Sequence, residues 1–185
     1  VAIPALDSLS GYPLPRSLAK GRDITLIAGA ALSVGEERIY ALAEDEAGYQ
    51  QLCALPTAHN REPTASYLAA LQRAENALTL ATSSPALLSV LKETTPRLFA
   101  AITPTDLRAV TAAKALGLKL LACDDAYLFS KEEWPTHRLL RAIGSNSTIQ
   151  GDQGPGRGGV LLDPEAWRDA FSSWPEAMEN TEAIA

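Results

Sequence analysis

The sequence predicts an α/β fold with a mainly parallel sheet, closed as a barrel or open as a doubly wound sheet. Strand-like runs alternate with loops or helical patterns about six times along the chain. Several of the helices begin with a capping residue followed by proline. Such alternation is typical of parallel strands joined by helical crossovers.

The first half of the chain is expected to form three strands and two main helices. The strands cover residues 1–6, 23–29 and 37–43. A turn or two of helix is expected at 16–20, and a turn at Gly35 joins the second and third strands. A helix begins near residue 46 and is expected to end before Pro56. Residues 64–75 predict the next helix from their apolar spacing.

The alternation continues to residue 123. Strands are expected at residues 77–82, 97–102 and 118–123. Ser84 and Pro85 predict the helix after the first of these strands. Thr103 and Pro104 predict the start of the next helix, which Gly117 ends.

The remaining third is expected to be helical apart from one loop. Ser130, three residues before Glu133, predicts a capped helix that carries His137 and ends near Gly144. The chain is interpreted as one domain, with a core at 1–149, a glycine-rich loop at 150–160 and C-terminal helices at 161–185. The loop lacks a Gly-Lys-Ser/Thr sequence, so we expect a surface loop and no phosphate-binding site.

The amino-acid composition and net charge argue against some classes of function. The 185 residues are 46% hydrophobic and 21% charged, enough for one sizeable core. The net charge of -6 argues against a module that binds nucleic acid unaided. Neither a membrane-length apolar run nor a signal peptide is found, so a cytoplasmic protein without membrane contact is expected. In that compartment Cys53 and Cys123 are predicted to be free, buried thiols. The first residue is Val1 and the only methionine is Met178, which predicts a piece of a longer chain.

Four stretches, in order, resemble one protein family. They are IAGAALSV, ALAEDEAGYQQLCAL, LGLKLLACDDAYLFSKEEWPTHRLLRAI and FSSWPEAMENTEAIA, at residues 27–34, 41–55, 116–143 and 171–185. Together they resemble the PHP domain (polymerase and histidinol phosphatase) of the bacterial DNA polymerase III alpha subunit. The last two stretches are the more specific, because they match a strand-end segment and the hinge that leads into the polymerase body. The resemblance implies a distorted barrel of about seven strands. The family's first strand and helix would precede Val1 and are missing here.

The family's metal cluster is expected to be degenerate in this chain. The resemblance implies about nine ligands, several of them histidines, that hold divalent cations for phosphoester attack. Two acidic positions remain, Asp7 and Asp125. Four further ligand positions carry Ser8, Ala31, Arg38 and Tyr127, and the region 97–106, where the family has Glu and His, offers no ligand. We therefore predict no catalytic residue, no metal and no cofactor.

For the remaining candidate residues we favour a structural role over a catalytic or binding role. Asp124 and Asp125 form either a metal remnant or acid–base pair, or caps of the following turn that pair with an arginine. Asp7 is expected in a turn, His137 in a structural hydrogen bond and His59 in an exposed loop. Lys131, Arg138 and Arg141 either contact phosphate or a partner's carboxylates, or form a solvated face.

Three functions follow as hypotheses. The leading one is a non-catalytic PHP-like module that braces the parent DNA polymerase and docks its proofreading exonuclease subunit, while the polymerase itself contacts the DNA. The alternative is an active metal-dependent phosphoesterase or 3′–5′ exonuclease whose ligands lie partly outside this chain. The third is a free-standing α/β binding protein.

Overall fold

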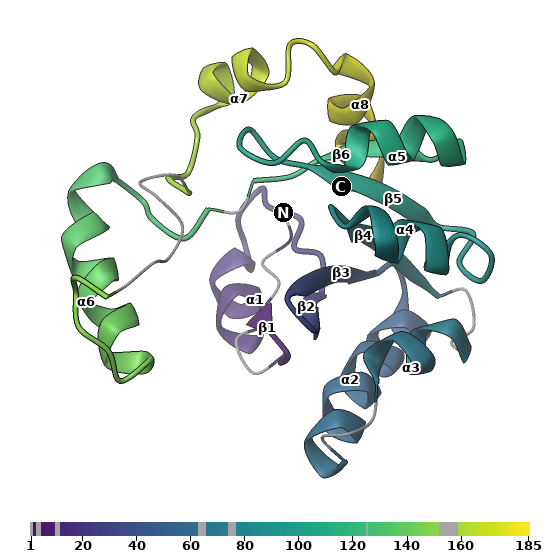
Figure 1. The fold of residues 1–185 in the computed structure, drawn as a ribbon, viewed down its shortest axis with the longest axis horizontal. Helices are drawn as coiled ribbons and strands as arrows, with labels where there is room; N and C mark the ends of the chain where they lie inside the picture. Colours follow the sequence, from purple (N-terminus) through teal and green to yellow (C-terminus); the bar gives the residue numbers. More distant parts are fainter. Residues whose placement is uncertain are drawn as a thin grey trace.

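A computed structural model describes residue 2 and residues 5–9, 12–62, 66–73, 77–124, 126–151 and 159–185. It shows an α/β fold with one open mixed sheet, in the strand order β1-β2-β3-β4-β5-β6 (Figure 1). The strands are β1 (Ala5–Leu6), β2 (Gly29–Val34), β3 (Glu37–Ala43), β4 (Leu78–Thr82), β5 (Leu98–Ile102) and β6 (Lys119–Ala122). Five strands form the body of the sheet, and the two-residue β1 lies at one edge.

The sheet is mixed where a mainly parallel one was predicted. β1 runs parallel to β2, and β4, β5 and β6 run parallel to one another, but β3 is antiparallel to both β2 and β4. The short turn at Gly35, where φ is +61°, joins β2 to β3 as a hairpin. This turn sets the register in which Gly29–Val34 pairs with β3. The strand predicted at 23–29 is therefore shifted along the chain, and β2 begins at the residue where the predicted strand ends.

The helices follow most of the expected starts. They are α1 (Pro13–Ala19), α2 (Glu46–Arg61), α3 (Tyr67–Arg73), α4 (Pro85–Leu91), α5 (Ala109–Leu116), α6 (Trp134–Gly144), α7 (Pro164–Ala170) and α8 (Pro175–Ile184), with a 3₁₀ turn, η1 (Lys131–Glu133), before α6. The prediction that Pro56 ends a helix is wrong, because α2 continues to Arg61. Pro56 is buried beside Leu52 and Leu55, and this packing offsets the hydrogen bond that proline cannot donate.

The predicted helix start at Thr103 is also wrong. Thr103 and Asp106 exchange backbone hydrogen bonds of 3.0 and 3.2 Å, and the Asp106 amide also donates to Thr103 Oγ1 at 3.0 Å. A threonine hydroxyl that binds a nearby amide stabilises a turn in place of a helix. α5 therefore begins only at Ala109, and it ends at Gly117 (φ +65°) as predicted.

The main core lies on the face of the sheet covered by α2, α3, α4 and α5. Leu32, Ile39, Leu80 and Ile102 point to this face and are fully buried, or nearly so. A smaller cluster on the other face joins Ala81, Ala101 and Leu121 to Ile184 of α8. Two buried faces are typical of an α/β sheet, so the fold class predicted from the sequence is confirmed.

The free edge of β6 is covered by α8, which lies beside it in Figure 1. Asn180 Nδ2 donates to the carbonyl of Leu120, and Thr181 Oγ1 lies 2.8 Å from the carbonyl of Ala122. These side chains take the place that a further strand would occupy. The barrel of about seven strands implied by the resemblance is not seen among the described residues, because β1 and β6 end the sheet and α8 blocks pairing on β6.

A segment that we call the arm, residues 126–151, leaves the sheet after β6 and carries η1 and α6. Figure 1 shows α6 standing apart from the sheet, at the left of the view. Glu133 accepts a hydrogen bond from the Ser130 amide at 3.4 Å, as the predicted capping box requires, and another from the Phe129 amide at 2.7 Å. In the part of the chain that the structure describes, no helix is long and apolar enough to cross a bilayer.

Candidate functional site at the carboxyl ends of the strands

Several acidic and hydroxyl side chains lie at one edge of the sheet. The parallel strands β1, β4, β5 and β6 all end there, and β3 begins there because it runs antiparallel to β4. In α/β proteins ligands bind at this edge, because loops of several strands converge on it. Asp7, Glu37, Ser83 and Asp106 lie next to those strand ends.

Asp7 is held in a turn by Ser33. Its backbone has φ +48°, and its amide donates to the carbonyl of Ala31 at 2.8 Å. Its carboxylate accepts hydrogen bonds from the Ser33 amide at 2.8 Å and the Ser33 hydroxyl at 2.7 Å. Asp7 thus extends the short pairing of β1 with β2, which agrees with the turn role expected from the sequence.

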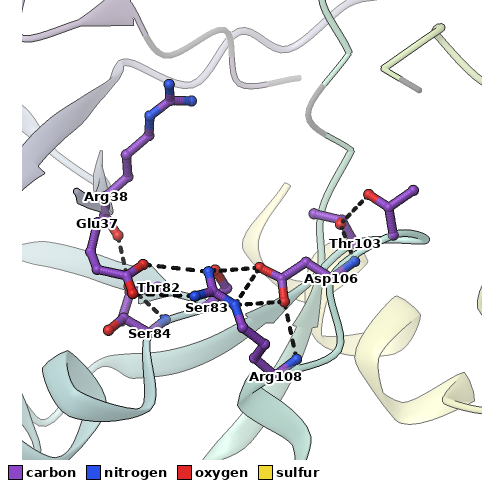
Figure 2. Close-up of polar contacts among 9 residues, drawn as sticks. Glu37, Arg38, Thr82, Ser83, Ser84, Thr103, Asp106 and Arg108 are labelled. Atoms are coloured by element: carbon purple, nitrogen blue, oxygen red, sulfur yellow. Dashed lines mark hydrogen bonds and ion pairs between the residues drawn. The ribbon is translucent and has the colours of Figure 1, made fainter. Parts of the chain in front are cut away.

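Figure 2 shows a second cluster, centred on Arg108. Arg108 Nε lies 3.1 Å from both carboxylate oxygens of Asp106, and Nη2 lies 3.0 Å from Oδ2. The same guanidinium reaches Glu37, with Nη1 at 3.2 Å from Oε1 and Nη2 at 3.4 Å from Oε2. Nη2 also lies 3.3 Å from the Ser83 hydroxyl. One arginine therefore links β3, the loop after β4 and the loop after β5.

The ion pairs shift the pKa values of this cluster. Partial burial opposes ionisation of Asp106, but hydrogen bonds from the Arg108 side chain and amide, and from Ser83, outweigh it and lower the pKa of Asp106. The hydrogen bond to Asp106 is the main cause that raises the pKa of Arg108; the charge of Asp106 and the hydrogen bond and charge of Glu37 add to it, while partial burial opposes it. Both carboxylate contacts are made by a permanently charged guanidinium, so this position repels a metal cation.

The resemblance aligned two positions on β2 and β3, Ala31 and Arg38, with metal ligands; Ala31 adjoins the Asp7 turn and Arg38 follows Glu37. Ala31 is buried in β2 and pairs with Leu6 and Tyr40. Arg38 pairs with Ser33, and its carbonyl accepts a 2.7 Å hydrogen bond from the Thr82 hydroxyl. In Figure 2 the Arg38 side chain extends away from the Arg108 cluster. Position 38 therefore brings a second cation to this edge of the sheet.

The acidic pair after β6 is only partly described. Asp125 lies outside the described residues. Asp124 Oδ2 accepts a hydrogen bond from the Leu162 amide at 3.4 Å, which ties the end of β6 to the segment before α7. This contact gives Asp124 a structural role, but the donor belongs to the segment before α7, whereas a cap of the following turn was expected.

Tyr127 and His137 belong to the arm. Their rings stack with centroids 4.6 Å apart, and the Trp134 ring lies 5.9 Å from His137. The backbone amide of Tyr127 donates to Gly159 at 2.9 Å. The Nε2 atom of His137 is buried and makes no hydrogen bond that the described part of the chain provides, so ring stacking is the structural role seen for His137.

The structure also places four other residues that the sequence analysis named. His59 lies in α2 and is half-buried against the ring of Tyr67, with centroids 4.4 Å apart, so the exposed loop position was wrong. The extension of α2 through Pro56 explains this placement. Cys53 and Cys123 are free thiols as predicted, but both are half-buried. Ser8 follows Asp7 and is half-buried.

The chemistry of this edge favours cross-linking of strands over catalysis. Within the described ranges, no three His, Cys, Asp or Glu side chains gather in a way that would hold a metal ion. A cavity of about 620 Å³ lies at the opposite end of the sheet, where Tyr12, Asp45, Tyr49 and Ile184 line it. The strand-end edge is thus occupied by ion pairs, and the cavity lies away from it.

Sequence reasoning missed the Arg108 cluster. Glu37 and Asp106 are separated by almost 70 positions (106 − 37 = 69) and meet only because β3 and β5 flank β4. The local signal was an acidic and a basic residue, Asp106 and Arg108, two positions apart just after a strand. This signal was overlooked because the same residues were assigned to the first turns of a helix, whereas α5 begins at Ala109.

The comparisons with known proteins give no relative from which a function can be transferred. No protein-family model matches the chain, and no curated protein matches it.

Proposed function

We propose that this chain is a non-catalytic PHP-like module of a bacterial DNA polymerase III alpha subunit. In this role the open sheet serves as the scaffold of a former barrel, and it braces the polymerase body. The C-terminal stretch supports the proposal, since its Pro-Glu-Ala and Asn-Thr residues resemble the family's hinge and Asn180 and Thr181 hold α8 against β6. The proofreading exonuclease subunit is the expected docking partner.

The observation that carries the non-catalytic part is the Arg108 cluster. Metal-dependent phosphoester hydrolysis needs carboxylates and histidines that are free to bind cations. At this edge Glu37 and Asp106 are instead paired with Arg108, and Arg38 stands at a family ligand position. Cations fixed by the protein stabilise the sheet and oppose metal binding.

Metal titration of the whole chain tests the non-catalytic role. Calorimetry with Zn²⁺ and Mn²⁺ is expected to give no stoichiometric binding at micromolar affinity, and a 3′–5′ exonuclease assay is expected to give no product. The matched control is Asp7→Asn, which removes the retained acidic position that the structure describes. Tight binding that is weaker in Asp7→Asn, together with nuclease activity, would instead support the active phosphoesterase.

The gene sequence tests whether this chain is part of a DNA polymerase. The coding sequence after Ala185 is expected to encode a polymerase palm with its carboxylate triad. A stop codon or an unrelated domain at that point would overturn the polymerase assignment and favour a free-standing binding protein.

A further inference from the structure

The cavity at the end of the sheet opposite the Arg108 cluster is lined by two tyrosines from different helices. Its volume of about 620 Å³ lies within the range typical of small-molecule sites. Tyr12, at the start of α1, and Tyr49 of α2 have ring centroids 5.9 Å apart, with the ring planes tilted by 44°. Both side chains are half-buried. Two adjacent aromatic rings in a cavity of this size offer a wall on which a further ring can pack.

Each tyrosine shares a helix face with one charged residue of the same cavity. Arg16 lies four residues after Tyr12, and its amide donates to the Tyr12 carbonyl at 3.1 Å. Glu46 lies three residues before Tyr49, in the first turn of α2. Residues at these spacings lie side by side on one face of a helix. The cavity is therefore bordered by a guanidinium from α1 and a carboxylate from α2, in addition to the two rings.

The positive charge of Arg16 acts on the Tyr49 hydroxyl. The hydrogen bond with the Cys53 thiol is the main cause that raises the pKa of Tyr49, and the charge of Arg16 opposes this rise. Because the interaction of two charges weakens with distance, this effect places the guanidinium near the Tyr49 ring. Arg16 is therefore positioned to bind an anionic group of a ligand that packs on this ring.

The chain itself engages the two other acidic side chains that line the cavity. Glu44 pairs with Arg97, and Asp45 caps the first turn of α2 through a 2.8 Å hydrogen bond from a backbone amide. Arg16 and Glu46 are exposed, and neither belongs to an ion pair within the described part of the chain. These two residues have opposite charges but do not pair with each other, so each can bind a charged group of a ligand.

We propose that this cavity binds a small zwitterion of the amino-acid class that carries an aromatic ring. The carboxylate of the ligand would pair with Arg16, its ammonium group would face Glu46, and its ring would pack on the two tyrosines. A ligand with only one of the two charges would leave one charged side chain of the cavity without a partner, so the site selects for both. This inference rests on the cavity alone and holds whether or not the parent chain is a polymerase.

Calorimetric titration of the whole chain tests the proposal. The probes are L-phenylalanine and the dipeptide glycyl-L-phenylalanine, which share the ring and both charges but differ in the distance between the charges. The control compounds are phenethylamine, which lacks the carboxylate, and 3-phenylpropionate, which lacks the ammonium group. At least one zwitterion is expected to bind with a dissociation constant below about 1 mM, and at least about tenfold more tightly than either control. Binding of neither zwitterion, or equal binding of a control compound, would overturn the proposal.

Variants that remove one charge assign the binding to the cavity. Arg16→Gln and Glu46→Gln are each expected to weaken binding of the tighter zwitterion at least about tenfold. The matched control is Lys20→Gln, which removes an exposed cation just after α1 that does not line the cavity and is expected to leave binding unchanged. Circular dichroism of each variant verifies that the chain is folded. Unchanged binding in either cavity variant, or an equal loss in Lys20→Gln, would overturn the assignment.

Discussion

In the body of the molecule, the sheet with α2–α5 and α8, apolar side chains turn inward and most buried polar atoms meet a partner. In the arm, α6 turns two arginines inward and its leucines outward. Asn180 and Thr181 show the first arrangement, because they satisfy the free carbonyls of β6. The difference teaches that packing against the sheet fixes which side chains are buried in the body, whereas α6 stands apart from the sheet and leaves its apolar side chains exposed in the described part of the chain.

The largest expected difference between the two regions concerns a glycine in each. A Cβ on Gly48 of α2 would lie 2.3 Å from the Ala77 carbonyl oxygen, whereas one on Gly144 of α6 meets nothing within 4 Å. Gly48→Ala is expected to lower the free energy of unfolding by about 3 kcal/mol through backbone overlap. Gly144→Ala is expected to leave it unchanged or raise it by up to about 1 kcal/mol. Urea unfolding of both variants measures this, and equal effects would contradict the close packing of α2.

The contact between α8 and β6 is expected to be the next most sensitive feature. Thr181→Val keeps the shape of the side chain but leaves the Ala122 carbonyl without its donor, and should cost about 1 to 2 kcal/mol. Ser145→Ala is the matched change in the arm, because the Ser145 hydroxyl donates only to carbonyls of its own helix and is expected to contribute less than about 0.5 kcal/mol. Hydrogen exchange of β6 amides should rise in Thr181→Val. Unchanged exchange would mean that α8 does not protect this edge.

Two buried polar side-chain atoms in the described body lack a hydrogen-bond partner, Gln51 Oε1 and the hydroxyl of Tyr67. The hydroxyl of Tyr67 is buried beside the Asp7 carboxylate, but no hydrogen bond of good geometry joins the pair. Burial, followed by the field of the Asp7 carboxylate, raises the pKa of Tyr67 from 10.0 to about 12. Tyr67→Phe removes a hydroxyl without a partner, so it is expected to raise the free energy of unfolding by about 1 kcal/mol at neutral pH.

The same shift predicts a dependence on alkaline pH. Because the folded pKa of Tyr67 is the higher one, the contribution of the neutral hydroxyl is fully present below pH 10 and is lost as pH rises toward 12, by about 1.4 kcal/mol per unit. Urea unfolding between pH 9 and pH 11 is expected to show a steeper loss for the natural chain than for Tyr67→Phe. A variant that is less stable at pH 7 would mean that Tyr67 and Asp7 are hydrogen-bonded in solution.

A smaller effect is expected at the Arg108 cluster. The Arg108 side chain is 56% exposed, so solvent screening limits each ion pair to about 0.5 kcal/mol. The pKa of Asp106 is lowered from 3.8, so its contribution is present above pH 3.8 and is lost as pH falls through the lower, folded value. Asp106→Asn should cost less than about 1 kcal/mol at pH 7 and flatten the acid limb of the stability curve. High salt should reduce the difference between the two proteins.

Local signals in the sequence predicted much of the body, and the errors arose where distant segments meet. Asp163 caps α7 and Gly117 ends α5 as their local patterns require, because capping depends on neighbouring residues alone. The direction of β3, the continuation of α2 through Pro56 and the meeting of Glu37 with Arg108 all depend on tertiary packing. Asp7 was correctly expected in a turn, but its partner Ser33, on a neighbouring strand, was not predicted.

The smallest effect on stability is expected on the exposed apolar face of α6, which Leu139, Leu140 and Ile143 form. Leu140 is 62% exposed, so Leu140→Ala removes little buried apolar area and should change the free energy of unfolding by less than about 0.5 kcal/mol. The same substitution at Leu88, which is fully buried in α4, should cost about 3 kcal/mol through the cavity that it leaves. Thermal and urea unfolding of the two variants compare the regions directly. If Leu140→Ala were as destabilising as Leu88→Ala, this face of α6 would be buried by the chain itself in solution, and the arm would be folded against the body.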